Sequence, residues 1–286
     1  MVPIFGTLFQ IARYGTLWNM VKTDQSLSGA DRVLAALKVL AERPKGVRLG
    51  ELGVELGAPK STTHRVLATL RRSDLAEQDA EGRYHLSPEF TRLAFRHYEA
   101  LGDWNIVQGV LDALVRRFGE TAYYAKLEGS RVVYQAMSRS QGQLHTASVV
   151  GDRADAWSTS LGKALLAGAL PDRAAVERFV EEHGPLRAHT ANTKTTAAAL
   201  HEELAATRRR GYSIDNEENE AGVVCIGFPV YLRPAARPTG AISVAAIKIR
   251  TPLQTLLDRA HEARATVEQH LGSGAVAGLG QAPNRE

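Results

Sequence analysis

The stretch Pro59-Lys60-Ser61-Thr62-Thr63-His64-Arg65 decides how the N-terminal part of this 286-residue chain folds. Pro59 suits the first position of a helix, where a backbone N–H would have no partner within the helix. Val66, Leu67 and Leu70 follow at helical spacing and predict a buried face. The sequence therefore predicts a helix over residues 59–70 whose first two turns are crowded with polar side chains.

Two shorter helices are predicted before this one. Apolar residues recur every three or four positions over residues 30–41 and 49–56, which is typical of amphipathic helices. Gly57 is well placed to end the second of them, because glycine readily adopts the conformation that follows a helix C-terminus. Two short helices joined by a glycine-containing turn indicate a helix-turn-helix.

A small hairpin is predicted next in the chain. Residues 75–78 and 83–86 have strand-like patterns and flank a loop, residues 79–82, that is rich in turn-forming residues. Three helices followed by a hairpin are typical of a winged helix. Arg83 lies beside the tip of the hairpin, where a side chain can contact a phosphate or the minor groove of DNA.

The charge of this region favours nucleic acid as a partner. Residues 27–72 carry nine Lys or Arg and four Asp or Glu, and no acidic residue occurs between residues 58 and 72. A solvated helix face would explain the polar residues but not the absence of acids. In a helix-turn-helix the first turns of the second helix enter the major groove of double-stranded DNA. The predicted DNA-binding residues are Lys60, Ser61, Thr62, His64, Arg65 and the wing residue Arg83.

The overall composition limits the other possibilities. A single cysteine, Cys225, excludes an intrachain disulfide and argues against a cysteine-based zinc site. We predict no cofactor, no metal site and no catalytic residue. No uncharged apolar run is long enough to span a membrane, and we expect a cytoplasmic protein. Residues 1–26 are interpreted as a poorly ordered extension or as an amphipathic segment that docks on its own domain.

The remaining chain predicts an α+β protein. Residues 27–88 form the predicted winged helix-turn-helix, 89–103 a linker helix, 104–272 a second domain and 273–286 a disordered tail. In the second domain, strands are predicted at residues 121–127, 131–137, 144–150, 223–231 and 241–249. Helices are predicted at residues 160–169, 172–182, 196–210 and 252–271. Strand hairpins with helices grouped between them favour a mainly antiparallel sheet.

Several segments, taken together and in order, resemble the IclR family of bacterial transcriptional regulators. They are residues 32–34 (RVL), 49–52 (LGEL), 59–67 (PKSTTHRVL), 119–121 (GET), 161–167 (LGKALLA), 211–218 (GYSIDNEE) and 222–226 (GVVCI). The resemblance implies that the second domain is a GAF-like effector domain, which binds a small organic acid or an aromatic metabolite. It places the effector pocket at Ser160, Leu161, Asp215, Val223, Cys225 and Ser243.

The residues themselves are compatible with such a pocket. Hydroxyl and N–H groups at residues 158–160 could stabilise a carboxylate, although each hydroxyl could instead serve as an ordinary helix cap. Alternation places Val223 and Cys225 on one face of a strand and Ser243 on one face of its expected neighbour. Taken alone, Cys225 fits a small buried hydrophobic residue, and Asp215 heads an acidic run of the kind found in solvated loops.

The sequence departs from the family just before Ser160. Relatives usually have a Pro-Leu-His-like segment there, whereas this chain has Asp155-Ala156-Trp157. Trp157 could form a flat apolar wall for the effector or pack against the helix that it precedes. Both interpretations stay open at this point.

The sequence therefore predicts a DNA-binding repressor whose operator affinity is controlled by a small effector. We expect a homodimer, or a dimer of dimers, because one recognition helix contacts few base pairs and paired half-sites increase specificity. One alternative is a regulator whose second domain serves only for oligomerisation. The other is an enzyme that uses Cys225 as a nucleophile, which would require a nearby base.

Overall fold

The computed structural model describes residues 28–100, 104–139, 146–232, 235, 237–272 and 275–276. The predicted N-terminal extension, residues 1–26, lies outside the described residues, and so does most of the predicted tail. Ala275 and Val276 are buried, and the N–H of Tyr231 donates to the carbonyl of Ala275 at 2.8 Å, so this part of the tail is packed, not disordered. The chain divides into two compact units between Ala100 and Leu101.

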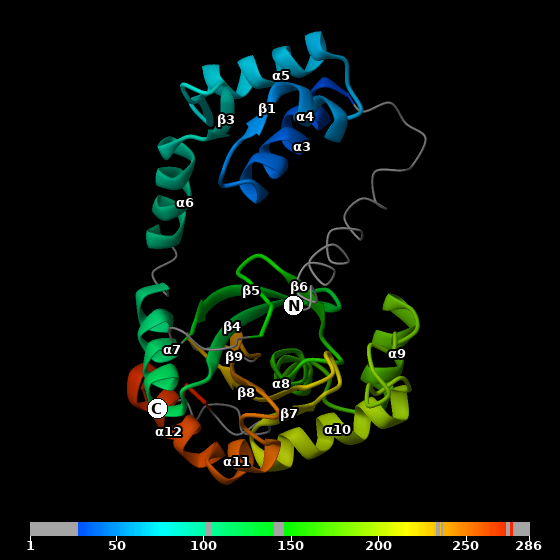
Figure 1. Ribbon diagram of the computed structural model, residues 1–286. Helices are drawn as coiled ribbons and strands as arrows, with labels where there is room; N and C mark the ends of the chain where they lie inside the picture. The colour runs from blue at the N-terminus through cyan, green and yellow to red at the C-terminus, as the bar shows by residue number, and fades with distance from the viewer. Residues whose placement is uncertain are drawn as a thin grey trace, which may run out of the picture. The chain divides into compact units, whose positions relative to one another are not determined.

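The N-terminal unit is a winged helix-turn-helix (Figure 1). Its elements are α3 (Gly29–Glu42), β1 (Val47–Arg48), α4 (Leu49–Glu55), α5 (Lys60–Arg72), β2 (Ala76–Gln78), β3 (Arg83–Leu86) and α6 (Pro88–Ala100). Leu40, Leu52, Leu67 and Leu70 are buried together and hold the three short helices against the wing. The predicted helices and hairpin are present, which confirms this part of the fold.

One strand of the wing was not predicted. β1 has only two residues, Val47 and Arg48, and pairs antiparallel with β3 to make a three-stranded sheet of order β1-β3-β2. Two residues are too short to show an alternating pattern, so sequence reasoning had no signal for this strand.

The second unit is built on a six-stranded antiparallel sheet of order β6-β5-β4-β9-β8-β7. Its strands are β4 (Thr121–Glu128), β5 (Arg131–Ser138), β6 (Arg153–Asp155), β7 (Ser213–Asn216), β8 (Val223–Val230) and β9 (Gly240–Ile247). Its helices are α7 (Trp104–Phe118), α8 (Ser160–Ala169), α9 (Arg173–His183), α10 (Ala197–Arg210), α11 (Leu253–Asp258) and α12 (Ala260–Leu271).

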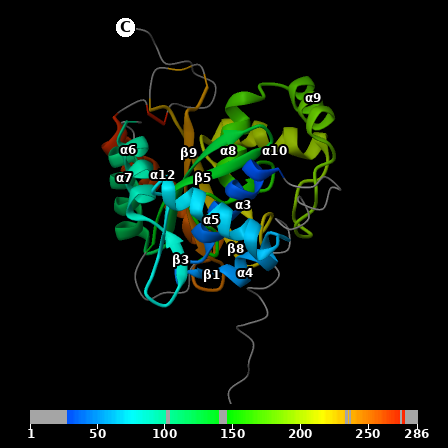
Figure 2. The ribbon, with the colours of Figure 1, turned by 90° about the horizontal axis from the view of Figure 1, so that it is seen from above.

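Helices cover both faces of this sheet, and each face has its own hydrophobic core (Figure 2). On one face α7, α11 and α12 bury residues such as Leu111 and Val267 against Ile226. On the other, α8, α9 and α10 bury Leu165 and Leu204. Because strand residues alternate between the faces, β4, β5, β8 and β9 each contribute to both cores.

Three details of this unit differ from the sequence-based expectation. Residues 146–150, the described part of the predicted third strand, are not a strand, and the short edge strand β6 follows them instead. β7 was not predicted, because its four residues precede an acidic run that resembles a solvated loop. The predicted last helix is two helices, with a break at Arg259.

Helix α8 packs unusually close to its neighbours. A Cβ atom at Gly162 would lie 2.2 Å from the carbonyl oxygen of Ala156, and one at Gly227 would lie 2.8 Å from the backbone of Ser160. Both distances are far below van der Waals contact, and the obstructing atoms at Ala156 and Ser160 are backbone. Glycine is therefore required at both positions for α8 to lie against β8.

We expect Gly162→Ala to lower the free energy of unfolding by at least about 2 kcal/mol, because the methyl group forces α8 away from Ala156. Gly109→Ala in α7 is the matched control, since no atom lies within 4 Å of its added Cβ. That variant should be stabilised by about 0.5–1 kcal/mol through its higher helix propensity. Urea unfolding of both variants measures the difference, and equal stabilities would contradict this account of the packing.

Candidate DNA face and effector pocket

The first turns of α5 present an exposed polar face. Lys60, Ser61, His64 and Arg65 are exposed and Thr62 is half-buried, whereas the apolar residues of the helix are in the core. No hydrogen bond or ion pair within the described residues involves the side chains of Lys60, His64 or Arg65. Their positive and hydrogen-bonding groups are therefore available to a partner.

Thr63 has a different role from its neighbours in the same stretch. It is buried, and its hydroxyl donates to the carbonyl of Pro59 at 3.1 Å. The added Cβ of Gly53 would lie 3.2 Å from both this hydroxyl and the carbonyl of Ala58, so the turn between α4 and α5 is tightly packed. Thr63 thereby fixes the direction in which α5 leaves the turn.

The wing residue Arg83 is held by acidic neighbours. Its guanidinium lies 3.2 Å from the Asp79 carboxylate and 3.9 Å from that of Glu81. His85 also contacts Asp79, at 2.8 Å, and this hydrogen bond, with further help from Arg83, lowers the pKa of Asp79 to about 2. Arg83 is thus less available to DNA than the unpaired residues of α5.

A cavity of about 30 Å³ lies in the second unit between α8 and the sheet. This is room for about two water molecules at ~10–15 Å³ each, so a larger ligand enters only when the walls move. The predicted pocket residues around it are Ser160, Leu161, Asp215, Val223, Cys225 and Ser243. Trp157 does not line it.

Strand register explains why these residues meet. Cys225 on β8 pairs with Ala245 on β9, and Val223 and Ser243 lie two residues away on their respective strands. All four side chains therefore point to the same face of the sheet and line the cavity. The sheet forms the floor of the pocket.

Two tyrosines that sequence reasoning missed form another wall. Tyr123 on β4 and Tyr134 on β5 line the cavity, and their ring centroids are 5.1 Å apart in an edge-to-face contact. The Tyr123 hydroxyl lies 2.7 Å from the hydroxyl of Thr146 and donates to the carbonyl of Ser148 at 3.1 Å. In the sequence both tyrosines resemble ordinary core residues of alternating strands.

The N-terminus of α8 supplies the polar end of the pocket. Thr159 is its N-cap and accepts from the N–H of Gly162 at 3.0 Å, whereas Ser158 bonds to Asp155 and Asn219. These two hydroxyls are therefore structural. Within the described residues, the backbone N–H groups of Ser160 and Leu161 donate to no partner, and both residues line the cavity.

Asp215 on β7 is a buried carboxylate in the pocket wall, with 3% of its surface exposed. Its Oδ1 accepts from the N–H of Glu218 at 2.7 Å and more weakly from that of Asn219 at 3.4 Å. Burial raises the pKa of Asp215 to about 7, against the opposing effect of the positive charge on Lys163. The carboxyl group therefore changes its charge near neutral pH.

Cys225 is buried beside Asp215 and is not activated. Burial raises the pKa of its thiol well above the usual value, and the charge of Asp215 acts in the same direction. A reactive cysteine needs the opposite shift, toward thiolate at neutral pH. The surroundings of Cys225 suit packing rather than nucleophilic attack.

A buried ion pair lies behind the pocket. Lys163 on α8 is fully buried, and its Nζ lies 2.5 Å from the carboxylate of Glu218, which is also buried. Glu203 on α10 lies 4.0 Å from the same ammonium and pairs with Arg210 at 2.8 Å. A lysine in an otherwise apolar helix was the available sequence signal for this pair, but it was not assigned a role.

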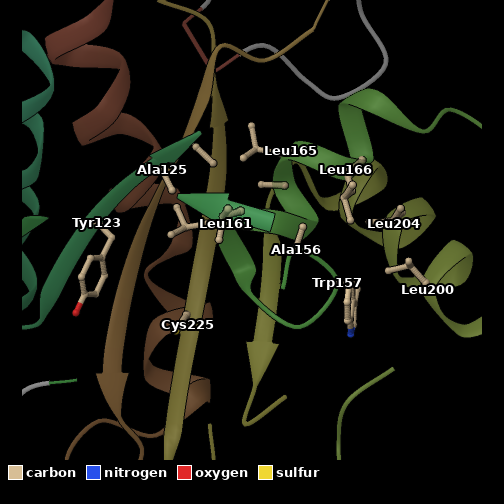
Figure 3. Packing of buried hydrophobic residues seen from close by; sticks show 14 of the residues in the cluster. Tyr123, Ala125, Ala156, Trp157, Leu161, Leu165, Leu166, Leu200, Leu204 and Cys225 are labelled. Carbon is tan, nitrogen blue, oxygen red and sulfur yellow. The ribbon is translucent and has the colours of Figure 1, made fainter. Parts of the chain in front are cut away.

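Trp157 packs away from the cavity. Its indole N–H donates to the carbonyl of Arg187 at 3.1 Å, and Figure 3 shows the ring on the side of Leu200 and Leu204, apart from Cys225 and Tyr123. Trp157 therefore does not form a wall of the cavity; its ring lies toward α10, in the same hydrophobic cluster as residues of α8, the helix that it precedes. Its partner Arg187 begins a segment, residues 187–194, that we call the brace.

The brace holds the turn that follows Asp215. Thr190 and Thr193 donate to the carbonyls of Glu217 and Glu218, each at 2.6 Å, and Asn192 donates to that of Asn216 at 3.1 Å. Through Trp157 and these three bonds, the brace connects the segment before α8 to the turn after β7. Both of these segments border the cavity.

The described residues contain no helix long and apolar enough to cross a membrane. They also contain no group of three or more His, Cys, Asp or Glu that could hold a metal ion.

A winged helix-turn-helix joined to a ligand-pocket domain defines a class of one-component DNA-binding regulators. Residues 29–80 match the model of the IclR helix-turn-helix domain, and residues 102–269 match that of the bacterial transcriptional regulator IclR C-terminal domain. The chain belongs to the IclR family of bacterial transcriptional regulators, as the sequence resemblance predicted.

Individual relatives agree with this assignment. The DNA-binding transcriptional repressor YiaJ of Escherichia coli is 30% identical over 203 residues, covering 70% of this chain and 71% of the relative. The crystal structure of Thermotoga maritima IclR has the same fold, with a TM-score of 0.71 at 22% identity, covering 85% of this chain and 98% of that one.

A structure of the second domain alone is also similar. It is the inducer-binding domain of a PobR double mutant from Acinetobacter in complex with 3-hydroxybenzoic acid. It is 28% identical with a TM-score of 0.52, and covers 58% of this chain and 95% of that one.

The buried carboxyl group gives a testable pH dependence. The pKa of Asp215 rises from 3.8 in the unfolded chain to about 7 in the folded one, so the folded state binds more protons between these values. The free energy of unfolding therefore falls as pH rises from about 4 to about 7, by a few kcal/mol at most. Asp215→Asn removes this loss while keeping an oxygen for the N–H groups of Glu218 and Asn219.

We expect the Tm of Asp215→Asn, relative to that of the unaltered protein, to be higher at about pH 8 than at about pH 5. Thermal unfolding followed by circular dichroism in matched buffers measures both differences. A Tm difference that does not change with pH would show that Asp215 is ionised throughout and would contradict the assigned pKa.

Proposed function

We propose that this IclR-family regulator represses transcription by binding operator DNA through α5, and that a small organic effector in the pocket of the second unit controls this binding. The observation that carries the proposal is the coexistence of two unsatisfied sites in one chain. Among the described residues, the basic side chains of the α5 face have no partner, and the backbone N–H groups of Ser160 and Leu161 in the pocket lining donate to none.

On this proposal, Lys60, Ser61, Thr62, His64 and Arg65 contact bases and phosphates in the major groove. They lie in the first turns of the second helix of the motif, where direct base contacts are made in such proteins. Arg83 contacts the DNA backbone from the wing, and its pairing with Asp79 makes its contribution smaller. The repressor relative YiaJ supports repression as the outcome.

The effector is proposed to be a small organic acid or an aromatic metabolite. The PobR domain, which has the same fold, is in complex with 3-hydroxybenzoic acid. In this chain the residues proposed to contact the effector are Ser160, Leu161, Asp215, Val223, Cys225 and Ser243. Trp157, for which contact with the effector was one of two open interpretations, is instead proposed to support the pocket through the brace.

We also propose that the protein works in the cytoplasm as a homodimer, with two dimers able to assemble on one operator. Two half-sites give the specificity that a single recognition helix lacks. On α6, Leu93 and Phe95 are 45% and 60% exposed.

Two alternatives are less well supported. A second unit used only for oligomerisation has no need of a pocket with unpaired buried groups. An enzyme that uses Cys225 as a nucleophile would need a thiol with a lowered pKa and a nearby base. Burial instead raises the pKa of Cys225, and no histidine is among the described residues that line the cavity. We therefore propose that the protein is not an enzyme.

Replacing single basic residues tests the DNA face. Lys60→Ala and Arg65→Ala should each weaken binding to DNA of the protein's own promoter by about 1–3 kcal/mol. Where the lost contact is to a phosphate, the slope of log affinity against log salt should also fall by about one. Lys38→Ala, an exposed lysine on α3, is the matched control and should change affinity by less than about 0.5 kcal/mol.

Fluorescence anisotropy with labelled promoter DNA at several salt concentrations measures these affinities. If Lys60→Ala and Arg65→Ala bind like Lys38→Ala, then α5 is not the recognition helix.

Binding of an effector can be tested independently of DNA. A compound that binds only the folded protein should add about 2.7 kcal/mol of stability at one hundred times its Kd, and Tm should rise accordingly. 3-Hydroxybenzoate and a panel of small organic acids are suitable probes, and any that raises Tm should also change promoter affinity. A ligand that raises Tm but leaves promoter affinity unchanged would favour a second unit without a regulatory role.

A further inference from the structure

Two arginines face each other on the sheet of the wing. Arg48 on β1 and Arg83 on β3 are register partners in an antiparallel pair, so their side chains leave the sheet side by side on one face. The neighbouring partners Val47 and Tyr84 are buried in the hydrophobic core of the unit, on the opposite face. Arg48 is exposed and Arg83 is half-buried. The outer face of the wing therefore carries two adjacent positive charges.

The fold alone gives no reason for an arginine at position 48. Like charges directly opposite each other on neighbouring strands destabilise a sheet. Arg48 is also the N-cap residue of α4, a position that favours Ser, Thr, Asp or Asn, and its side chain makes no capping hydrogen bond. In the part of the chain that the structure describes, the Arg48 guanidinium has neither a hydrogen-bond partner nor an ion-pair partner.

Arg83 is held in one orientation and keeps several of its donors. Its Nε donates to Asp79 at 3.2 Å, and Asp79 in turn accepts from the backbone N–H of Arg83 at 2.7 Å and contacts His85 at 2.8 Å. The His85 ring packs on the turn before β1, where an added Cβ at Gly46 would overlap it. A guanidinium has five N–H donors. The terminal Nη groups of Arg83 donate to no described residue, and the Glu81 carboxylate is 3.9 Å away.

An anion between the two guanidinium groups would remove their repulsion and accept from their remaining donors. The place of the pair in the fold favours a phosphate of the DNA backbone. Both arginines lie at the end of the sheet that carries the hairpin turn, residues 79–82, and Arg48 leads directly into α4, the first helix of the helix-turn-helix. In such motifs the first helix crosses the DNA backbone while the second enters the major groove.

We propose that Arg48 and Arg83 bind one phosphate of the operator backbone between them, which makes Arg48 a DNA-binding residue. The inference rests on the proposed DNA-binding function and adds to it a second contact surface, on β1 and β3, beside that of α5. Because a phosphate contact carries no information about the bases, this pair strengthens binding without selecting a sequence.

Arg48→Ser separates DNA binding from stability, because serine is a preferred N-cap residue and the change removes the repulsion of Arg83. We expect the Tm of this variant to equal or exceed that of the unaltered protein. Its affinity for labelled promoter DNA should fall at least about threefold, and the slope of log affinity against log salt should fall by about one. Arg43→Ser removes the same charge from an exposed arginine that is paired with Glu55, and as the matched control it should change affinity less than about twofold.

A double-mutant cycle shows whether the two arginines share one phosphate. Once Arg48 is replaced, Arg83 has already lost the shared contact. Arg83→Ala should therefore weaken binding by a factor at least about twofold smaller in the Arg48→Ser background than in the unaltered protein. Fluorescence anisotropy with the same labelled promoter DNA gives the four affinities of the cycle.

Three results overturn the proposal: promoter affinity as high in Arg48→Ser as in Arg43→Ser, a loss of affinity that accompanies a lower Tm, or a cycle in which the two losses simply multiply. Failure of the wider function is recognised separately, because Lys60→Ala and Arg65→Ala would then leave promoter affinity unchanged as well. If those two variants weaken binding and Arg48→Ser does not, only the wing contact is absent.

Discussion

The pocket depends on the ion pair between Lys163 and Glu218, which is buried behind it. Taking two charges out of water is costly, and removing one partner of such a pair typically costs 3–5 kcal/mol because the other is left unpaired. Lys163 belongs to α8 and Glu218 to the turn after β7, so the pair fixes the start of the helix against the strand that carries Asp215. This contact therefore helps to position both the N–H groups at the start of α8 and Asp215.

Two other features make this arrangement rigid. Gly162 and Gly227 let α8 approach Ala156 and β8 to distances that any side chain would prevent. The brace, residues 187–194, then connects Trp157 to the turn after β7 through bonds to backbone carbonyls. These contacts thereby hold the polar groups at the start of α8 and at the end of β7 in fixed positions relative to each other.

Much of the fold and part of the candidate site could be predicted from the sequence, because the residue patterns that indicate them are local. Helix periodicity and the position of Pro59 predict α5, and strand alternation places Val223 and Cys225 on one face. The strands β1 and β7 have too few residues to show a period. Asp215 resembled a loop residue because its burial comes from contacts with α8 and β8, and the positions of Trp157, Tyr123 and Tyr134 also depend on such long-range packing.

The DNA face and the pocket lie in different units, so control of one by the other requires a coupling free energy, and such coupling is reciprocal. The most direct measurement is the affinity of the unaltered protein for its tightest-binding probe, with and without saturating promoter DNA. We predict that the affinity for the probe differs between the two conditions, by the same factor by which the probe changes the affinity for promoter DNA. Equal affinities would contradict the claim that this pocket controls DNA binding.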